Sequence, residues 1–138
     1  MKRIALPLVL AAMLSSMISD TLDTTAPRIV NPLESHFRRI RGEVVAYSPA
    51  LMVGVTQRWT VRLETRAGES LSDARVAVVA YMPESGERSQ PSPVARYLGA
   101  GQYEIDGLRF WKPGWWNVGL AVQYSGGADS LAFNLIIP

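Results

Sequence analysis

The stretch LGAGQYEIDGLRFWKPGWW, residues 98–116, decides how the folded part of this chain is organised. It contains three of the four tryptophans, and its glycines and its proline lie where short runs of alternating apolar and polar residues stop. Glycine and proline at such points favour turns between strands. Tyr103 and Ile105 alternate with polar neighbours, as in a strand with one buried face. The stretch therefore predicts short β-strands joined by tight turns.

An alternation with a period of two continues on both sides of this stretch. Residues 58–66 alternate apolar with polar or charged side chains, and residues 116–124 and 131–137 repeat the pattern. Each run is typical of a strand with one face in a core and the other in water. Residues 42–47 and 51–55 predict two shorter strands.

Residues 74–82 differ from these runs because they are apolar almost throughout, with Arg75 as the exception. A strand of this composition is expected in the middle of a sheet, covered on both faces. Residues 83–93 are interpreted as a long loop that follows it. No segment after residue 20 predicts a helix of three turns. Seven or eight short strands separated by turn signals predict an all-β fold, an immunoglobulin-like antiparallel β-sandwich over residues 40–138.

Residues 1–19 have the layout of a secretory signal peptide. Lys2 and Arg3 precede an apolar run and several serines. An uncleaved anchor is the alternative, although the run is shorter than the roughly 20 residues that span a bilayer. We expect an exported protein, periplasmic or extracellular, which is anchored to the inner membrane if this segment stays. Residues 20–39 predict an irregular lead-in.

The charge balance argues against a nucleic-acid binder. The chain has 14 basic and 12 acidic residues, but Lys2 and Arg3 belong to the predicted signal peptide, which leaves 12 of each. Nucleic-acid binding depends on excess positive charge that meets phosphates. The chain also has no cysteine, so its stability in an oxidising compartment must come from packing and not from disulfides.

The sequence patterns of common enzymes are missing. The single histidine, His36, lies in the predicted lead-in, and there is no cysteine nucleophile, G-x-S-x-G motif or phosphate-binding loop. Glu84 and Glu87 are expected to be solvated loop charges and not an acid/base pair. Asp129 is expected to cap the turn at residues 126–127. We therefore expect a protein that is not an enzyme.

Several short motifs follow one another in an order that resembles a known family. They are Met82-Pro83, Gly101-x-Tyr103, Gly107-Leu108-x-Phe110, Pro113-Gly114-Trp115-Trp116 and Asp129-Ser130-x-x-Phe133. The ordered set is similar to the YtkA-like / FixH-like family of small exported or membrane-anchored β-sandwich domains, some of which are labelled auxin-binding proteins. The resemblance covers about residues 55–138. It implies an immunoglobulin-like sandwich outside the cytoplasm, in a family with members associated with copper handling or with assembly of respiratory oxidases.

The chain departs from this family where copper ligands are expected. Members thought to bind copper resemble one another in a His-Gly-His-Gly-like loop after Met-Pro and in a methionine just before the Pro-Gly turn. Here residues 84–90 contain no histidine, and Lys112 stands before the turn, where its ammonium repels a cation. His36 and Met82 remain candidate metal ligands, although Met82 is expected in the core. We therefore expect no cofactor, with copper as the open alternative.

Two functions remain. The first is a non-catalytic interaction or accessory module that binds a protein or peptide partner, for example during assembly of an envelope or respiratory complex. If Trp116 faces inward, Trp115 faces outward, and Trp111 lies on the preceding turn beside Lys112 and Arg109. Exposed tryptophan and arginine side chains are enriched at interface hot spots. The alternative role of the two outer tryptophans is to cover the open end of the sandwich.

The second function is a carrier of a metal or small ligand with a degenerate or redirected site. Glu84, Glu87 and His36 are the donors available to it. This function requires that the fold bring the lead-in to the same end of the sandwich as the loop of residues 83–93.

Overall fold

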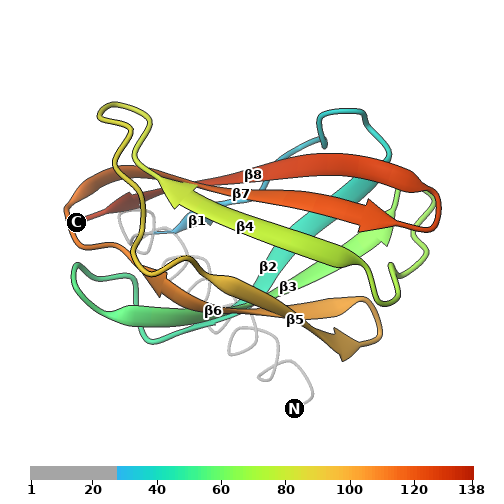
Figure 1. Cartoon of the computed structure of the whole chain (residues 1–138), viewed down its shortest axis with the longest axis horizontal. Helices are drawn as coiled ribbons and strands as arrows, with labels where there is room; N and C mark the ends of the chain where they lie inside the picture. The colour runs from blue at the N-terminus through green and yellow to red at the C-terminus, as the bar shows by residue number, and fades with distance from the viewer. Residues whose placement is uncertain (1–27) are drawn as a thin grey trace, which may run out of the picture.

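The computed structural model describes residues 28–138, which form an all-β sandwich of two four-stranded antiparallel sheets (Figure 1). Sheet A contains, in spatial order, β1 (Ile29–Val30), β8 (Gly127–Ile137), β7 (Gly114–Tyr124) and β4 (Arg75–Tyr81). Sheet B contains β2 (Ile40–Ser48), β3 (Thr56–Thr65), β6 (Gln102–Arg109) and β5 (Val94–Gly99). The predicted fold class is confirmed.

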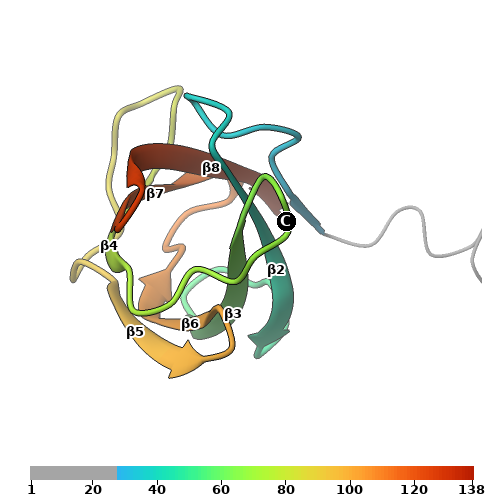
Figure 2. The same ribbon diagram turned by 90° about the vertical axis from the view of Figure 1, so that its right-hand side faces the viewer.

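The two sheets lie face to face, with β7 and β8 above β5 and β6 in the end-on view (Figure 2). The predicted signal peptide, residues 1–19, lies outside the described residues. Within residues 28–138, no helix has the length and apolar character needed to cross a membrane.

The core lies between the sheets and is built on aromatic side chains. The Trp59 ring centroid lies 6.2 Å from that of Phe110 and 6.3 Å from that of Phe133, and Phe110 lies 5.3 Å from Trp116. All four side chains are fully buried. Burial of a side chain of this size stabilises the fold by about 2–3 kcal/mol relative to exposure. The alternation in the sequence is confirmed, because the residues with the period of two lie on the inward faces of their strands.

Two strand predictions were wrong. Residues 74–82 were expected in the middle of a sheet, but β4 is the edge strand of sheet A, and Ala77 and Val79 on its outer side are exposed. Residues 51–55 form a turn and not a strand, and the Gly54 N–H donates to the Phe110 carbonyl at 2.8 Å. The misleading signal was Leu51, which is buried as a core residue of this turn.

The strand β5 (Val94–Gly99) was not predicted because none of its side chains is fully buried. The turn that follows it explains the glycines at the start of the opening stretch. Gly99, Ala100 and Gly101 have φ angles of 103°, 52° and 74°. At Gly101, a Cβ would lie 2.9 Å from the Leu63 carbonyl oxygen, so the close approach of β3 also requires glycine.

The lead-in is attached to sheet A. Its residues Ile29 and Val30 pair with β8, so the sheet begins before the predicted start at residue 40. Asp129 does not cap the turn at residues 126–127. Its carboxylate accepts hydrogen bonds from the Ser35 hydroxyl and from the backbone N–H groups of Phe37 and Arg39. These bonds hold the lead-in against β8.

The Asp129 carboxyl group is ionised in this environment. Burial alone would raise its pKa, but the hydrogen bonds from Ser35, Phe37, Arg39 and its neighbour Ser130 outweigh burial and lower the pKa to about 2. The carboxylate therefore fastens the lead-in at ordinary pH.

Candidate interaction surface

The outward side chains of β4, β7 and β8, together with Val30 of β1, form a surface that we call face A. Strand register sets them in rows: Ile136 and Trp115; Val30, Asn134, Asn117 and Tyr81; Ala132, Gly119 and Val79; Ser130, Ala121 and Ala77; Ala128, Gln123 and Arg75. The one charged side chain in these described rows is Arg75, at the end of the last row. No carboxylate lies among them.

Face A exposes large apolar side chains at one end, and its middle holds small side chains and Val79. Val30 is 57% exposed, Val79 42%, Trp115 38% and Ile136 60%. Apart from Val79, the third and fourth rows hold alanine, glycine and serine, so they project little above the sheet. An antiparallel sheet that faces water usually carries polar side chains on its outer side. Face A instead has the composition of a sheet that is covered on both sides.

Trp115 is held in place on face A by two asparagines. Its indole Nε1–H donates to the Asn134 Oδ1 at 2.9 Å, and the Asn117 side-chain amide donates to the same oxygen at 3.2 Å. The polar atom of the indole is therefore already satisfied within the chain. What remains exposed is apolar ring surface with a fixed orientation, which loses little conformational freedom when it is covered.

The outer side of sheet B has a different character. It carries a series of ion pairs between neighbouring strands: Arg96 with Glu104 at 2.9 Å, Arg58 with Asp106 at 3.6 Å and with Glu104 at 3.8 Å, and Arg62 with Glu43. The arginine side chains of these pairs are exposed, and the attraction within each pair is weak because water screens it. The two outer sides of the sandwich therefore differ in polarity.

Trp111 and Lys112 lie on the turn between β6 and β7, as predicted. The Lys112 ammonium lies 5.8 Å from the centre of the Trp111 ring and 3.4 Å from the Glu87 carboxylate. The Lys112 carbonyl accepts a hydrogen bond from the buried Trp116 indole at 2.9 Å. This turn is thus fastened to the core on its inner side and presents Trp111, which is 45% exposed, on its outer side.

The loop after β4 folds back on itself and contacts the same turn. The Ser89 N–H donates to the Ala80 carbonyl at 2.8 Å, and the Ser89 hydroxyl donates to the Arg109 carbonyl at 2.9 Å. Glu84 lies exposed near the tip of this loop. A shallow groove separates the loop from the turn, and it is lined by Glu87, Arg88, Gln90, Arg109 and Trp111.

The structure therefore divides the predicted site residues into two groups. Glu87, Arg109, Trp111 and Lys112 come together at the groove, which we call the rim. Trp115 lies on face A, in β7, just after the same turn. The two glutamates predicted as solvated charges do not form a pair, because Glu87 faces Lys112 and Glu84 is exposed at the loop tip.

The predicted metal donors are not brought together. The His36 N–H donates to the Ser130 carbonyl, beside Ala121 of β7, whereas Met82 follows the β4 residue that pairs with Asn117. These two β7 positions are four residues, about 13 Å, apart along the strand. Met82 is buried, as expected for a core residue. Within residues 28–138, no group of three or more histidine, cysteine, aspartate or glutamate side chains is placed to hold a metal ion.

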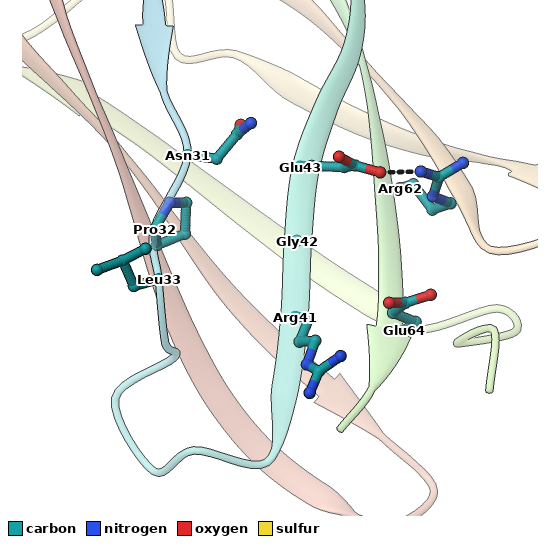
Figure 3. A pocket seen from close by; sticks show the side chains of 8 residues that line it. All are labelled: Asn31, Pro32, Leu33, Arg41, Gly42, Glu43, Arg62 and Glu64. Atoms are coloured by element: carbon teal, nitrogen blue, oxygen red, sulfur yellow. Dashed lines mark hydrogen bonds and ion pairs between the residues drawn. The ribbon is translucent and has the colours of Figure 1, made fainter. Parts of the chain in front are cut away.

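A separate hollow of about 250 Å³ lies between the lead-in and the outer side of sheet B (Figure 3). Asn31, Pro32 and Leu33 form one wall, and β2 and β3 form the other. The Glu43 and Arg62 side chains on this wall form an ion pair with each other, and the Asn31 side chain accepts a hydrogen bond from the Val44 N–H at 3.0 Å. These contacts satisfy Glu43, Arg62 and Asn31 within the chain.

Face A as a whole was missed in the sequence, although its signal was present. The apolar composition of residues 74–82 predicted cover on both faces, whereas within residues 28–138 the outer side of β4 is exposed at Ala77 and Val79. The outward positions of β7 and β8 carry the same signal, since Gly119, Ala121 and Ala132 replace the charged residues found in β3.

Comparisons with known proteins bear on the fold. The sequence matches the YtkA-like family over residues 40–121, from the start of β2 into β7. Neither the search of curated proteins nor the search of solved structures gave a significant match. The FixH-like and auxin-binding labels rest on the sequence motifs alone. Because the match covers more than half of the chain, this protein belongs to the YtkA-like family.

Proposed function

We propose that this protein is a non-catalytic, exported accessory module that binds a protein partner through face A, with the rim at one end of the contact. The observation that carries the proposal is the lack of charge in the central rows of face A, beside exposed Val79, Trp115 and Ile136. Exposed apolar surface of this kind marks interaction sites in soluble proteins. Tryptophan is a residue type that dominates the binding energy of such interfaces.

The rim supports a contact at this end of the sandwich. Trp111 and Arg109 are exposed beside the groove, and both residue types are frequent in interface hot spots. The Glu87 carboxylate holds Lys112 close to the Trp111 ring, which leaves the lysine less free to move. A polar rim next to an apolar centre is the usual anatomy of a protein interface.

The test is site-specific photo-cross-linking in cells that make the full chain. A photoreactive residue at Ala132, in the middle of face A, is compared with one at Ala46, an exposed alanine on the outer side of sheet B. We expect protein adducts at Ala132 and far fewer at Ala46, and we expect Val79→Glu to remove the adducts. Equal labelling at the two positions, or no adduct at either, would contradict the proposal.

The alternative function, a carrier of copper or a small ligand, has weaker support from the geometry. His36 and Met82 lie at separate positions along sheet A, and Lys112 occupies the rim together with Glu87. We expect added Cu(I) to leave the melting temperature of the purified protein unchanged. Stoichiometric copper in the purified protein, lost on His36→Ala, would favour the carrier instead.

A further inference from the structure

We propose that the partner that covers face A is a second copy of this chain, so that two sandwiches pack face A against face A about a two-fold axis. This inference rests on the proposed function and names the partner for it. Three properties of face A support a second copy: the position of its charge, its flatness and its size.

The charge distribution permits self-association. In a two-fold interface the same surface meets itself, so a charge near the axis is brought close to its own copy and is repelled. The central row of face A, Ala132, Gly119 and Val79, carries no charge and no hydrogen-bonding side chain. An axis through this row therefore brings together only small and apolar side chains.

The position of Arg75 favours one orientation of the axis. An axis parallel to the strands would place the two copies of Arg75 at the same end of the interface. The other axis runs across the strands, in the plane between the two copies of face A. It exchanges the two ends of face A, so Arg75 of one copy lies toward the end of the other copy that carries Trp115. A guanidinium over an indole ring is a favourable contact. The second orientation is therefore the one we propose.

The shape of face A suits packing against another sheet. Sheets in a sandwich pack about 10 Å apart when small and medium apolar side chains face each other. Two adjacent rows of face A, Ala132, Gly119 and Val79 and then Ser130, Ala121 and Ala77, contain alanine, glycine, serine and one valine, and the Trp115 indole is held by Asn134. A second copy would give β4 the cover on both sides that its composition indicates.

The size of face A is sufficient for a small two-fold interface. Strands of 11 residues such as β7 and β8 extend about 35 Å, and three strands span about 14 Å, which gives about 500 Å² per copy. Two copies would together bury about 1,000 Å², near the lower limit for a specific interface. We therefore expect a reversible dimer with a dissociation constant in the micromolar range.

The first experiment uses the fact that the chain has no cysteine. Ala132→Cys places a single thiol near the proposed axis, and Ala46→Cys is the matched control on the outer side of sheet B. Because a dimer raises the local thiol concentration at Ala132 to about the millimolar level, oxidation of the purified full chain should give disulfide-linked dimers at least about tenfold faster than in the control.

The second experiment measures association directly by sedimentation over micromolar to submillimolar concentrations. Wild-type protein should dimerise, and Val79→Glu should weaken the dimer by at least about tenfold because it buries two like charges. Thr60→Glu, on the outer side of sheet B, should have no effect. Circular dichroism verifies that each variant is folded; if Val79→Glu does not fold, the cysteine pair decides alone.

The outcomes separate this inference from the proposed function. A chain that stays monomeric, with equal cross-linking rates for the two cysteine variants, would overturn the dimer. If Ala132 then forms photo-adducts with a different protein in cells, the interaction module stands and only the identity of its partner is wrong. If Ala132 gives neither dimers nor adducts, both proposals fail.

Discussion

The outer side of sheet B carries many charged side chains and that of sheet A few, although both sheets are built on the same alternation of inward apolar residues. The outer side of sheet B displays Arg58, Arg62 and Arg96 in ion pairs with acidic neighbours, whereas face A displays alanine, glycine, asparagine and a few large apolar groups. Alternation identifies the buried face of a strand. The residues between the buried positions indicate whether the other face is solvated or covered.

The strongest test of this difference compares the two tryptophans at the start of β7. Trp116 is fully buried, so Trp116→Ala should cost about 3–5 kcal/mol of unfolding free energy. Trp115 lies on face A, and Trp115→Ala should cost about 1 kcal/mol through its hydrogen bond to Asn134. Urea denaturation of both variants measures the difference. Equal losses would place Trp115 in the core and remove the anchor of face A.

The second test concerns Asp129, the ionised group that sheet A keeps buried. Its folded pKa of about 2 lies below the ordinary value of 3.8, so its contribution to stability is complete above about pH 4 and is lost as the pH falls toward 2. A shift of this size corresponds to about 2 kcal/mol.

Unfolding measured between pH 2 and about 5 should show this loss in wild-type protein and a smaller one in Asp129→Asn. Asp106→Asn, at an exposed carboxylate of sheet B, is the control and should keep the wild-type profile. Parallel profiles for wild type and Asp129→Asn would show that the lead-in does not depend on this carboxylate.

The third test concerns the ion pairs of sheet B. Glu104 accepts from Arg96 and lies near Arg58, yet both arginines are well exposed. We expect Glu104→Gln to lower the unfolding free energy by less than about 1 kcal/mol, and we expect the loss to shrink as salt is added. A loss that is large and independent of salt would mean that this side of the sandwich is also covered.

The smallest effect on the unfolding free energy is expected for a substitution on face A. Val79→Ser should change the unfolding free energy by no more than about 0.5 kcal/mol in dilute solution, because its side chain is exposed in the single chain. The same variant should lose more stability relative to wild type at high protein concentration, where only wild type gains from association. Denaturation midpoints at two concentrations measure both quantities.

The sequence predicted the sandwich, the inward faces of its long strands and the outward position of Trp115. These features follow from the period of two, which is local. The edge position of β4 was not predictable in this way, because strand order depends on contacts between distant segments. The same is true of the bond between Ser35 and Asp129, which are 94 residues apart, and of the bond that orients Trp115 on Asn134.

The candidate site was predictable in part. Residues 109–112 lie on one turn, so their proximity follows from the sequence, but the approach of Glu87 depends on how the loop after β4 folds back. His36 is a candidate metal donor because it is the single histidine of the chain, but the sequence does not show where the lead-in places it. Its backbone bond to Ser130 fixes that path.

The fastening of the lead-in also covers part of the edge of β8. Only Leu135 and Asn134 of β8 pair with β1, and the lead-in covers part of the remaining edge through the bond from His36 to Ser130. An uncovered edge of a long strand is a template on which another chain can add a strand. Acid that protonates Asp129 would release this cover, so the protein should become prone to strand addition along β8 before the core itself unfolds.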